Sequence, residues 1–312
     1  MLPTKPKIKQ KQSVLIIGAK GMLGAALCDI FSSYNVLDWD KEDCDITDKI
    51  STQKKISASK PDIIINAAAF TDVDGAEKDK DSAFRVNGEA VGNLADAAAN
   101  IGAVFVHYST DYVFSGVNPI GYAENDAPGP ALSRRSDSRE GGPLNIYGAS
   151  KLLGEENLRA CALARGTALK WYLIRTSWLF GPHGKNFVKT IYGLAGKNDE
   201  LRIVNNQHGK PTYTKDLAQA TKEIINSTLT SGIYHVTNET MSGGITWFDF
   251  AKEIINSAHF ATKIIPVSSA EFPRPARRPE FSVLINSKLP PRRMWQAALR
   301  EYIHLLLSGK DK

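Results

Sequence analysis

The sequence has few cysteines, no long apolar run and no histidine cluster. Its three cysteines, Cys28, Cys44 and Cys161, are far apart and form no CxxC pair. This pattern excludes a disulfide framework and favours a reducing, cytoplasmic compartment. No apolar run approaches the ~18 residues of a membrane span. The six histidines lack metal-ligand spacing, so no metal site is expected.

Positive charge is concentrated at the start of the chain. The net charge is +6, and Lys5, Lys7, Lys9 and Lys11 carry four of these charges. We interpret residues 1–12 as a flexible basic tail, because they lack the apolar core of a secretory signal. The remaining charges nearly balance. The sequence therefore predicts neither a nucleic-acid partner nor a membrane partner.

The first half of the chain alternates apolar runs with helical patterns. Strands are predicted at 13–17, 34–37, 62–66, 103–108 and 171–175, and helices at 21–31, 48–58, 83–100 and 146–163. Near-continuous apolar strands between helices are typical of a parallel sheet covered on both faces. The predicted fold class is α/β, with a Rossmann-type doubly wound parallel sheet.

Beyond residue 176 the pattern is looser, with more glycine, proline and aromatic residues and with helices expected at 214–225 and 247–257. We predict a dinucleotide-binding domain at 13–175 plus about 211–240, and a smaller mixed α/β substrate lobe at about 176–210 and 241–312. The segment 128–143 is rich in proline, glycine and polar residues. It is either a mobile surface loop or a loop beside the entrance of the active site.

A glycine-rich turn follows the first predicted strand. Gly18, Gly21 and Gly24 are spaced G-x-x-G-x-x-G between an apolar run and a helical pattern. Glycines in such a turn permit a tight bend, close approach of a pyrophosphate and close helix packing. Free N–H groups at the helix N-terminus then bind phosphate. The sequence therefore predicts a dinucleotide site here.

Two nearby residues favour different cofactors. Asp38 ends the second predicted strand, where a carboxylate accepts hydrogen bonds from ribose hydroxyls and favours NADH. Lys20 lies within the glycine-rich turn, where its ammonium suits the additional phosphate of NADPH. The cofactor is therefore predicted as NADPH or NADH, with the balance toward NADH.

Further candidate cofactor contacts follow the second and third strands. Asp45 is a candidate contact near the adenine of the cofactor. Alternatively, Asp45 or Thr47 caps the N-terminus of the following helix. The small residues Ala67, Ala68 and Ala69 follow the third strand. They either let the backbone lie against the cofactor or serve tight core packing.

A tyrosine and a lysine one helical turn apart are candidate catalytic groups. Tyr147 and Lys151 are spaced i and i+4, so both side chains lie on one face of a helix. A phenol has a pKa near ~10, and a nearby ammonium lowers this pKa. Thr110, at the end of the fourth strand, is placed to polarise a carbonyl group. This combination is typical of a short-chain dehydrogenase/reductase.

At these motifs the sequence resembles the dTDP-4-dehydrorhamnose reductases, a family of extended short-chain dehydrogenases/reductases. The resemblance extends from Ser13 to about Leu289 and rests on motifs at 18–24, 45–48, 66–74, 109–114, 147–151, 175–178, 186–187 and 278–279. The motifs at 109–114 and 175–178 are specific to this family, whereas the glycine-rich turn is shared with many related families. The segment 128–143 is longer than the usual connection in the family.

The resemblance implies that NAD(P)H reduces the 4-keto group of dTDP-4-dehydro-L-rhamnose to give dTDP-L-rhamnose. Thr110, Tyr147 and Lys151 match the catalytic positions of the family. The positions matched to the nucleotide sugar are Asp111, Tyr112, Trp178, Asn186 and Arg278. The predicted cofactor contacts are Gly18, Lys20, Gly21, Met22, Leu23, Gly24, Asp38, Asp45, Ile46, Ala67, Ala68, Ala69, Thr71, Tyr147 and Lys151.

Two of the substrate positions have alternative interpretations. Trp178 packs an aromatic face on the deoxyhexose or is an ordinary core tryptophan. Arg278 binds the diphosphate through its guanidinium or lies in a solvated basic loop.

Other functions stay open at this point. One is a non-catalytic NAD(P)-binding regulatory subunit, resembling the methionine adenosyltransferase β subunit. Another is a reductase or epimerase acting on a different nucleotide sugar. The intact catalytic trio and Trp178 argue against the subunit. Trp178 and the Met22-Leu23 pair argue against an epimerase. A nucleotide sugar is the expected partner, and a homodimer is one expectation for the oligomeric state.

Overall fold

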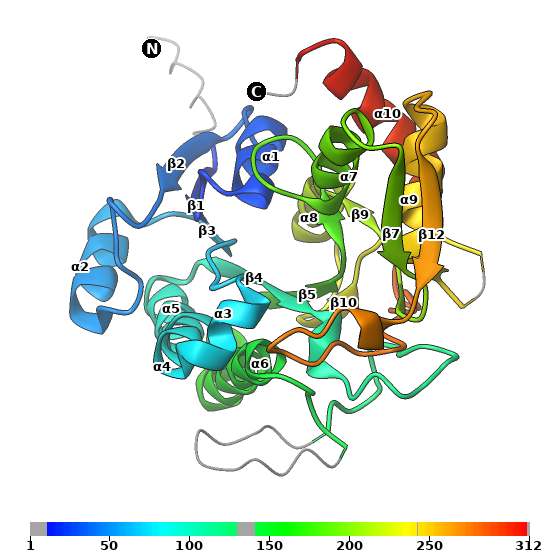
Figure 1. Ribbon diagram of the computed structural model, residues 1–312. Helices are drawn as coiled ribbons and strands as arrows, with labels where there is room; N and C mark the ends of the chain where they lie inside the picture. Colours follow the sequence, from blue (N-terminus) through cyan, green and yellow to red (C-terminus); the bar gives the residue numbers. More distant parts are fainter. Residues whose placement is uncertain (1–10, 130–140, 242, 311–312) are drawn as a thin grey trace, which may run out of the picture.

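The computed structural model describes residues 11–129, 141–241 and 243–310. Residues 1–10 of the predicted tail and most of the predicted loop 128–143 therefore lie outside the described residues. The described chain is built on a six-stranded parallel sheet (Figure 1). Its strands are β1 (Ser13–Ile17), β2 (Asn35–Trp39), β3 (Ile63–Asn66), β4 (Val104–Thr110), β5 (Trp171–Thr176) and β10 (Gly232–His235).

The strand order is β10-β5-β4-β3-β1-β2, and every neighbouring pair is parallel. The chain runs from β1 to β2 on one side and then crosses to β3 on the other side of β1. This reversal confirms the predicted doubly wound sheet, and it places the topological switch point between β1 and β3. β10 was not predicted as a strand, and it extends the sheet beyond β5.

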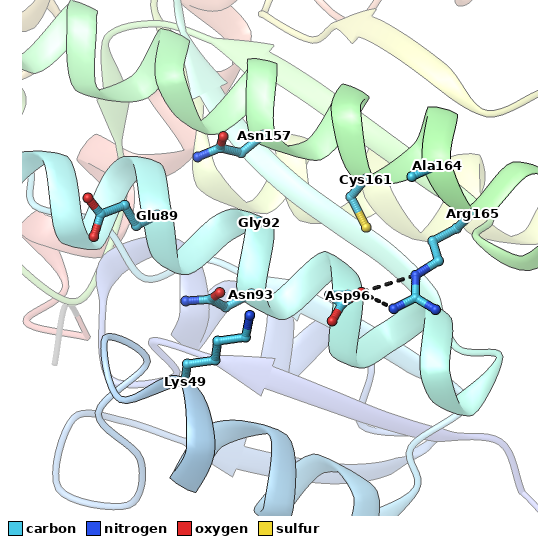
Figure 2. A pocket seen from close by; sticks show the side chains of 9 residues that line it. All are labelled: Lys49, Glu89, Gly92, Asn93, Asp96, Asn157, Cys161, Ala164 and Arg165. Carbon is cyan, nitrogen blue, oxygen red and sulfur yellow. Dashed lines mark hydrogen bonds and ion pairs between the residues drawn. The ribbon is translucent and has the colours of Figure 1, made fainter. Parts of the chain in front are cut away.

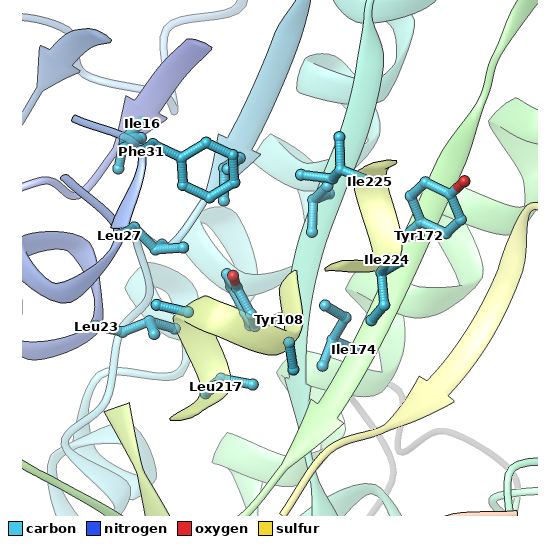
Figure 3. Packing of buried hydrophobic residues seen from close by; sticks show 14 of the residues in the cluster. Ile16, Leu23, Leu27, Phe31, Tyr108, Tyr172, Ile174, Leu217, Ile224 and Ile225 are labelled. Atoms are coloured by element: carbon cyan, nitrogen blue, oxygen red, sulfur yellow. The ribbon is translucent and has the colours of Figure 1, made fainter. Parts of the chain in front are cut away.

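Helices cover both faces of the sheet because successive strand residues point to opposite sides. Val14 and Ile16 pack against α1 (Met22–Ile30) and α8 (Thr214–Asn226). Figure 3 shows Ile16 in this cluster with Leu23, Leu27, Leu217 and Ile224. Leu15 and Ile17 pack on the opposite face, which carries α2 (Lys49–Ser59), α5 (Ala90–Ile101) and α6 (Ile146–Arg165). Among the described residues, no helix is long and apolar enough to cross a membrane.

The helix predicted at 83–100 is interrupted, and this is a correction. After α3 (Val73–Lys78), the chain forms α4 (Lys80–Phe84), a π-helical turn at Arg85–Glu89, and then α5. The π turn contains the buried Asn87. Its side chain accepts a hydrogen bond from the Phe70 N–H (2.8 Å) and donates to the Phe70 carbonyl (3.0 Å) and Ser150 Oγ (3.0 Å). The turn therefore fastens the segment after β3 to α6.

A second group of elements packs around its own apolar core, which includes Phe180, Phe250 and Tyr302. Its helices are α7 (Phe187–Ala195), α9 (Trp247–Ser257) and α10 (Trp295–Leu307). The short strands pair as β7 (Glu200–Val204) with β12 (Lys263–Val267), β6 (Leu179–Phe180) with β9 (Thr212–Tyr213), and β8 (His208–Gly209) with β11 (Ile245–Thr246). This group lies beside the carboxyl ends of the sheet strands (Figure 1).

Candidate active site

A cavity of about 1360 Å³ lies at the carboxyl ends of β1, β3, β4 and β5. Its opposite wall comes from the second group of elements, through Trp178, His183, Lys185 and Trp247. All three predicted catalytic residues line it, as do all predicted cofactor contacts except Asp38. Of the predicted substrate residues, Asp111, Tyr112 and Trp178 line the cavity. The structure thus brings together residues far apart in the chain, while their individual roles stay predictions.

The glycine-rich turn forms the floor of this cavity with the geometry that a phosphate requires. Gly18 has a φ of +79°, and a Cβ built there would lie 2.7 Å from the Ala68 nitrogen. A Cβ on Gly24 would lie 2.0 Å from the Gly18 oxygen, so the helix packs tightly on the turn. Gly21, which has no side chain, occupies the N-cap of α1. The first N–H groups of α1 are therefore available to a dinucleotide pyrophosphate.

The acidic residue at the end of the second strand is Asp40 rather than Asp38. β2 extends to Trp39, two residues further than predicted, because Leu37, Asp38 and Trp39 continue the pairing with β1. Asp38 is exposed, and among the described residues it lies outside the cavity lining, whereas Asp40 lines the cavity. Asp40 Oδ2 accepts a hydrogen bond from the Lys20 N–H (2.9 Å).

The side chain of Lys20 is already paired at the surface. Its ammonium donates to Glu42 at 2.8 Å, with both side chains well exposed. This carboxylate raises the pKa of Lys20. A 2′-phosphate would therefore compete with Glu42 for Lys20.

Asp45 forms a turn at the cavity edge and does not cap α2. Its Oδ1 accepts from the Thr47 N–H (3.0 Å) and the Thr47 hydroxyl (2.7 Å), which lower the pKa of Asp45. Asp48 caps α2 by accepting from the Ser51 N–H (3.1 Å). Both cap alternatives, Asp45 and Thr47, were therefore wrong, and Asp45 stays beside Ile46 in the cavity lining.

The catalytic trio meets where β4 ends and α6 begins. β4 extends to Thr110, whose hydroxyl donates to Asp111 Oδ1 (2.8 Å) and accepts from the Tyr112 N–H (3.2 Å). Tyr147 lies near enough to Thr110 for the threonine hydroxyl to lower the pKa of the phenol slightly. Lys151 follows one turn later and donates to the Tyr108 carbonyl oxygen (2.5 Å). A phenol, an alcohol and an amine therefore share one cavity wall.

The electrostatics of Tyr147 differ from the sequence prediction. Burial, reinforced by the charge of Asp111, raises the pKa of Tyr147 to about 12 against a smaller opposing effect of Thr110. Burial also lowers the pKa of Lys151 to about 8. The predicted lowering of the Tyr147 pKa by a lysine ammonium is therefore wrong for this structure. A protonated phenol is the form that a proton donor needs.

Local contacts hold the start of α6 against β4. Asn145 caps the helix by accepting from the Gly148 N–H (2.8 Å) and donates to the Arg277 carbonyl (2.8 Å). Glu77 accepts from the Ile146 N–H (2.9 Å), which places an acidic group at the positive end of the helix. Tyr147 is thus held in a first helical turn that is fixed on two sides.

Three predicted substrate residues line the same cavity as the trio. Asp111 is buried, and burial raises its pKa to about 6 although nearby hydroxyl groups oppose this. The Tyr112 and Tyr147 rings meet edge to face, with centroids 6.0 Å apart. The Trp178 indole stacks on Trp247 with centroids 3.5 Å apart and ring planes within 8°. A pair of indoles, not a single one, therefore forms this wall.

The other two predicted substrate residues serve structural contacts. Asn186 caps α7 by accepting from the Lys189 N–H (3.0 Å), and it donates to the Gly181 carbonyl (2.8 Å). Arg278 forms a two-pronged ion pair with Asp74, at 2.5 and 2.9 Å. Neither is among the described residues that line the cavity. The guanidinium fork is already occupied by a carboxylate, and a diphosphate would have to displace it.

The sequence reasoning missed Asp40, Asn87 and Trp247. An aspartate three residues beyond the predicted strand end is the signal for Asp40. Asn87 is one of three asparagines in the predicted helix 83–100, so its place in that pattern gave no specific signal. Trp247 was assigned only as a helix start, and its contact with Trp178 joins distant segments that no local pattern relates.

A second, smaller hollow of about 450 Å³ lies on α5 and α6 beside the start of α2 (Figure 2). Arg165 and Asp96 are joined there by an ion pair, with Nε 3.1 Å from Oδ1. Among the described residues, no residue lines both this hollow and the large cavity. It is therefore separate from the candidate active site.

The glycine-rich turn at the switch point and the Thr-Tyr-Lys trio beside it define a short-chain dehydrogenase/reductase. Comparison with known families assigns the chain more closely. It belongs to the RmlD substrate binding domain family, whose model matches residues 12–308.

Similar proteins support this assignment along nearly the whole chain. The chain is 38% identical to a dTDP-4-dehydrorhamnose reductase of Burkholderia thailandensis, covering 89% of this chain and 92% of that protein. It is 39% identical to the spore coat polysaccharide biosynthesis protein SpsK of Bacillus subtilis, covering 96% and 99%. A Bacillus anthracis dTDP-4-dehydrorhamnose reductase solved with NADP has a TM-score of 0.84 at 35% identity, covering 95% and 99%.

Proposed function

We propose that this chain reduces the 4-keto group of dTDP-4-dehydro-L-rhamnose with NAD(P)H, giving dTDP-L-rhamnose. The observation that carries the proposal is that Thr110, Tyr147 and Lys151 line the same cavity as the glycine-rich turn. Membership in the RmlD family supports it, as do relatives named dTDP-4-dehydrorhamnose reductase.

The residues around the turn fit a dinucleotide. The glycine floor and the free N–H groups of α1 suit the pyrophosphate, and Ala67, Ala68 and Ala69 leave room beside it. Asp40 and Asp45 suit ribose hydroxyls at the end of the cavity formed by β2 and the following turn. When bound, NAD(P)H supplies the hydride for the keto carbon.

The protein's own groups supply the proton and hold the sugar. Tyr147 donates the proton of its hydroxyl to the carbonyl oxygen, so the carbonyl becomes an alcohol, and the phenolate regains a proton from solvent. When substrate binds, the Thr110 hydroxyl turns its one hydrogen from Asp111 Oδ1 to the same carbonyl oxygen and polarises it. The buried Asp111 accepts hydrogen bonds from sugar hydroxyls. The paired indoles of Trp178 and Trp247 offer an apolar edge to the deoxyhexose.

The test is to incubate the protein with dTDP-4-dehydro-L-rhamnose and NADPH or NADH. We expect nucleotide oxidation, followed at 340 nm, and a product identified by NMR as dTDP-L-rhamnose. In Tyr147→Phe we expect turnover to fall ~10²-fold or more with cofactor affinity retained, because only the proton donor is lost. Unchanged turnover in this variant would remove Tyr147 from the mechanism.

Other outcomes separate the competing functions. Cofactor binding with no turnover on any keto sugar nucleotide would favour a regulatory subunit. Turnover restricted to a different nucleotide sugar would keep the reductase and replace its substrate. We also propose a cytoplasmic location, because Cys28, Cys44 and Cys161 are all unpaired, as in a reducing compartment.

A further inference from the structure

The loop between β6 and α7 carries a lysine to which the proposed reaction assigns no role. Lys185 is exposed, and it lines the large cavity together with His183 and Gly184 of the same loop. Within the described residues, its ammonium makes neither a hydrogen bond nor an ion pair with another residue. An unpaired positive charge is therefore available at the cavity wall.

This loop lies against the start of α1. A Cβ built at Gly184 would be 3.7 Å from the Cβ of Met22, the first residue of α1. Asn186 Nδ2 also lies 3.7 Å from Met22 Sδ. Figure 1 shows the loop before α7 passing beside α1. Lys185 lies between Gly184 and Asn186 in the chain, so it is held close to the end of α1 that offers free N–H groups.

The shape of the loop is fixed by contacts and by its backbone. Asn186 Nδ2 donates to the Gly181 carbonyl (2.8 Å) and to the Tyr302 hydroxyl (3.3 Å). His183 has a φ of +63°, in the left-handed region that residues other than glycine rarely occupy. Such a conformation persists where the surroundings determine it, and it occurs most often at binding and active sites. The loop is therefore a constrained part of the cavity wall.

Two other lysines that line the cavity are already engaged. The Lys20 ammonium donates to Glu42 at the surface (2.8 Å). The Lys151 ammonium donates to the Tyr108 carbonyl oxygen (2.5 Å). A negatively charged group at the glycine-rich turn would therefore have to draw either lysine away from its present partner.

Two further cations belong to another part of the cavity. The charges of Lys41 and Arg85 lower the pKa of Asp45, so both lie toward the end of the cavity that holds this aspartate. The N-terminus of α1 itself supplies only a partial positive charge. Among the described residues, Lys185 is therefore the unpaired cation placed to complete the neutralisation of a diphosphate at the glycine-rich turn.

We propose that Lys185 binds a diphosphate across the cavity from the glycine-rich turn, so that the ligand is held between the start of α1 and the loop before α7. The ammonium donates hydrogen bonds to phosphate oxygens, and the opposite charges strengthen these bonds. The closeness of Gly184 and Met22 assigns the diphosphate to the dinucleotide rather than to the nucleotide sugar. This inference rests on the proposed function, but binding is measured without turnover.

The test is the affinity for NADPH and NADH in the absence of a sugar nucleotide, measured by isothermal titration calorimetry. In Lys185→Met we expect the Kd to rise ~10-fold, because one charge-assisted hydrogen bond is lost. Lys185→Arg keeps the positive charge and should retain most of the affinity. The difference between Lys185→Met and the unmodified protein should shrink at high salt, because salt screens an exposed charge.

Lys197→Met is the matched control. Lys197 is also an exposed lysine, it follows the opposite end of α7, and it is not among the described residues that line the cavity. Its Kd values should equal those of the unmodified protein. Both methionine variants should keep the melting temperature of the unmodified protein, since each replaces an exposed side chain, so a loss of affinity in Lys185→Met is not a loss of fold.

A titration with dTDP distinguishes the two sources of a diphosphate. We expect the Kd of dTDP to be the same in Lys185→Met and in the unmodified protein. A rise for dTDP alone would assign Lys185 to the nucleotide sugar and overturn its place at the glycine-rich turn. Unchanged Kd values for both dinucleotides in Lys185→Met, or no binding of either to the unmodified protein, would also overturn the proposal. Failure of the reductase assay with the affinity difference intact would instead remove the proposed function and leave this site.

Discussion

Gly148 lies against the carbonyl oxygen of Tyr112, so closely that a Cβ built at position 148 would be 2.2 Å from that oxygen. Gly148 follows Tyr147 in the first turn of α6, and Tyr112 lies in the 3₁₀ turn Asp111–Val113 after β4. The absence of a side chain at position 148 therefore sets how closely the proton donor approaches the end of β4.

Gly148→Ala should separate α6 from this turn. We expect a loss of stability of ~1–3 kcal/mol, as for other overpacked sites. Turnover should fall as well, because Tyr147 moves with the helix. The measurements are urea unfolding and the reductase assay. Gly193→Ala in α7 is the control, because a Cβ there would meet no described atom within 4 Å apart from its chain neighbours and the backbone of its own helix. It should be neutral or stabilising, and equal stability of the two variants would contradict the prediction.

Asp40 should control the choice between NADH and NADPH. Its carboxylate lies in the cavity, where it can accept from ribose hydroxyls and repel a 2′-phosphate. We expect Asp40→Asn to shift the ratio of kcat/KM values toward NADPH by ~10-fold, the effect of ~1.4 kcal/mol. Asp38→Asn, at an exposed position, should leave the ratio unchanged. If the kcat/KM ratio shifted in Asp38→Asn and not in Asp40→Asn, Asp38 would be the ribose contact, as predicted from the sequence.

Asp111 should make stability depend on pH. Burial raises its folded pKa to about 6, above the unfolded value of about 3.9. The folded state therefore binds the proton more tightly, and this stabilisation is present below about pH 4 and lost as the pH rises through about 6. Asp111→Asn should gain stability over the unmodified protein between pH 4 and pH 8, by at most about 3 kcal/mol.

Thermal unfolding at several pH values measures the Asp111 effect. Asp29→Asn, at an exposed position of α1, is the control and should show no such gain. A constant difference between Asp111→Asn and the unmodified protein across this pH range would refute the assigned shift.

Replacing only one partner of the ion pair between Glu155 and Arg175 should destabilise the fold more than replacing both. Both side chains are at most 1% exposed. Arg175→Met leaves a buried carboxylate without its partner, and we expect a loss of ~3–5 kcal/mol. Replacing both residues with methionine should recover most of it. Lys215→Met, in the exposed pair with Glu301, should cost less than ~1 kcal/mol. A double-mutant cycle measures the coupling, and additive losses would contradict it.

The central sheet could be predicted from the sequence because its signals are local. Ser13–Ile17 and Ile63–Asn66 are short apolar runs. In the turn that follows the first run, Gly18 adopts a positive φ and Gly24 lets α1 pack closely. The spacing of Tyr147 and Lys151 on one helix is likewise local. These features needed no knowledge of distant partners.

The remaining features depend on contacts between distant segments. β10 is only four residues long and becomes a strand by pairing with Tyr172 to Arg175 of β5. The end of β2, and with it the placement of Asp40, is set by pairing with β1. The π turn at Asn87 is fixed by Phe70 and Ser150. No periodicity within these segments encodes such partners.

The cavity joins a floor made at Gly18 to a roof made at Trp247. During synthesis on the ribosome, the floor emerges long before the roof. A fragment released before α9 would carry Tyr147 and Lys151 but leave them open to bulk water, which competes for every hydrogen bond of the site. Reduction is therefore a property of the finished polypeptide. Degradation fragments that lack α9 should not oxidise NAD(P)H.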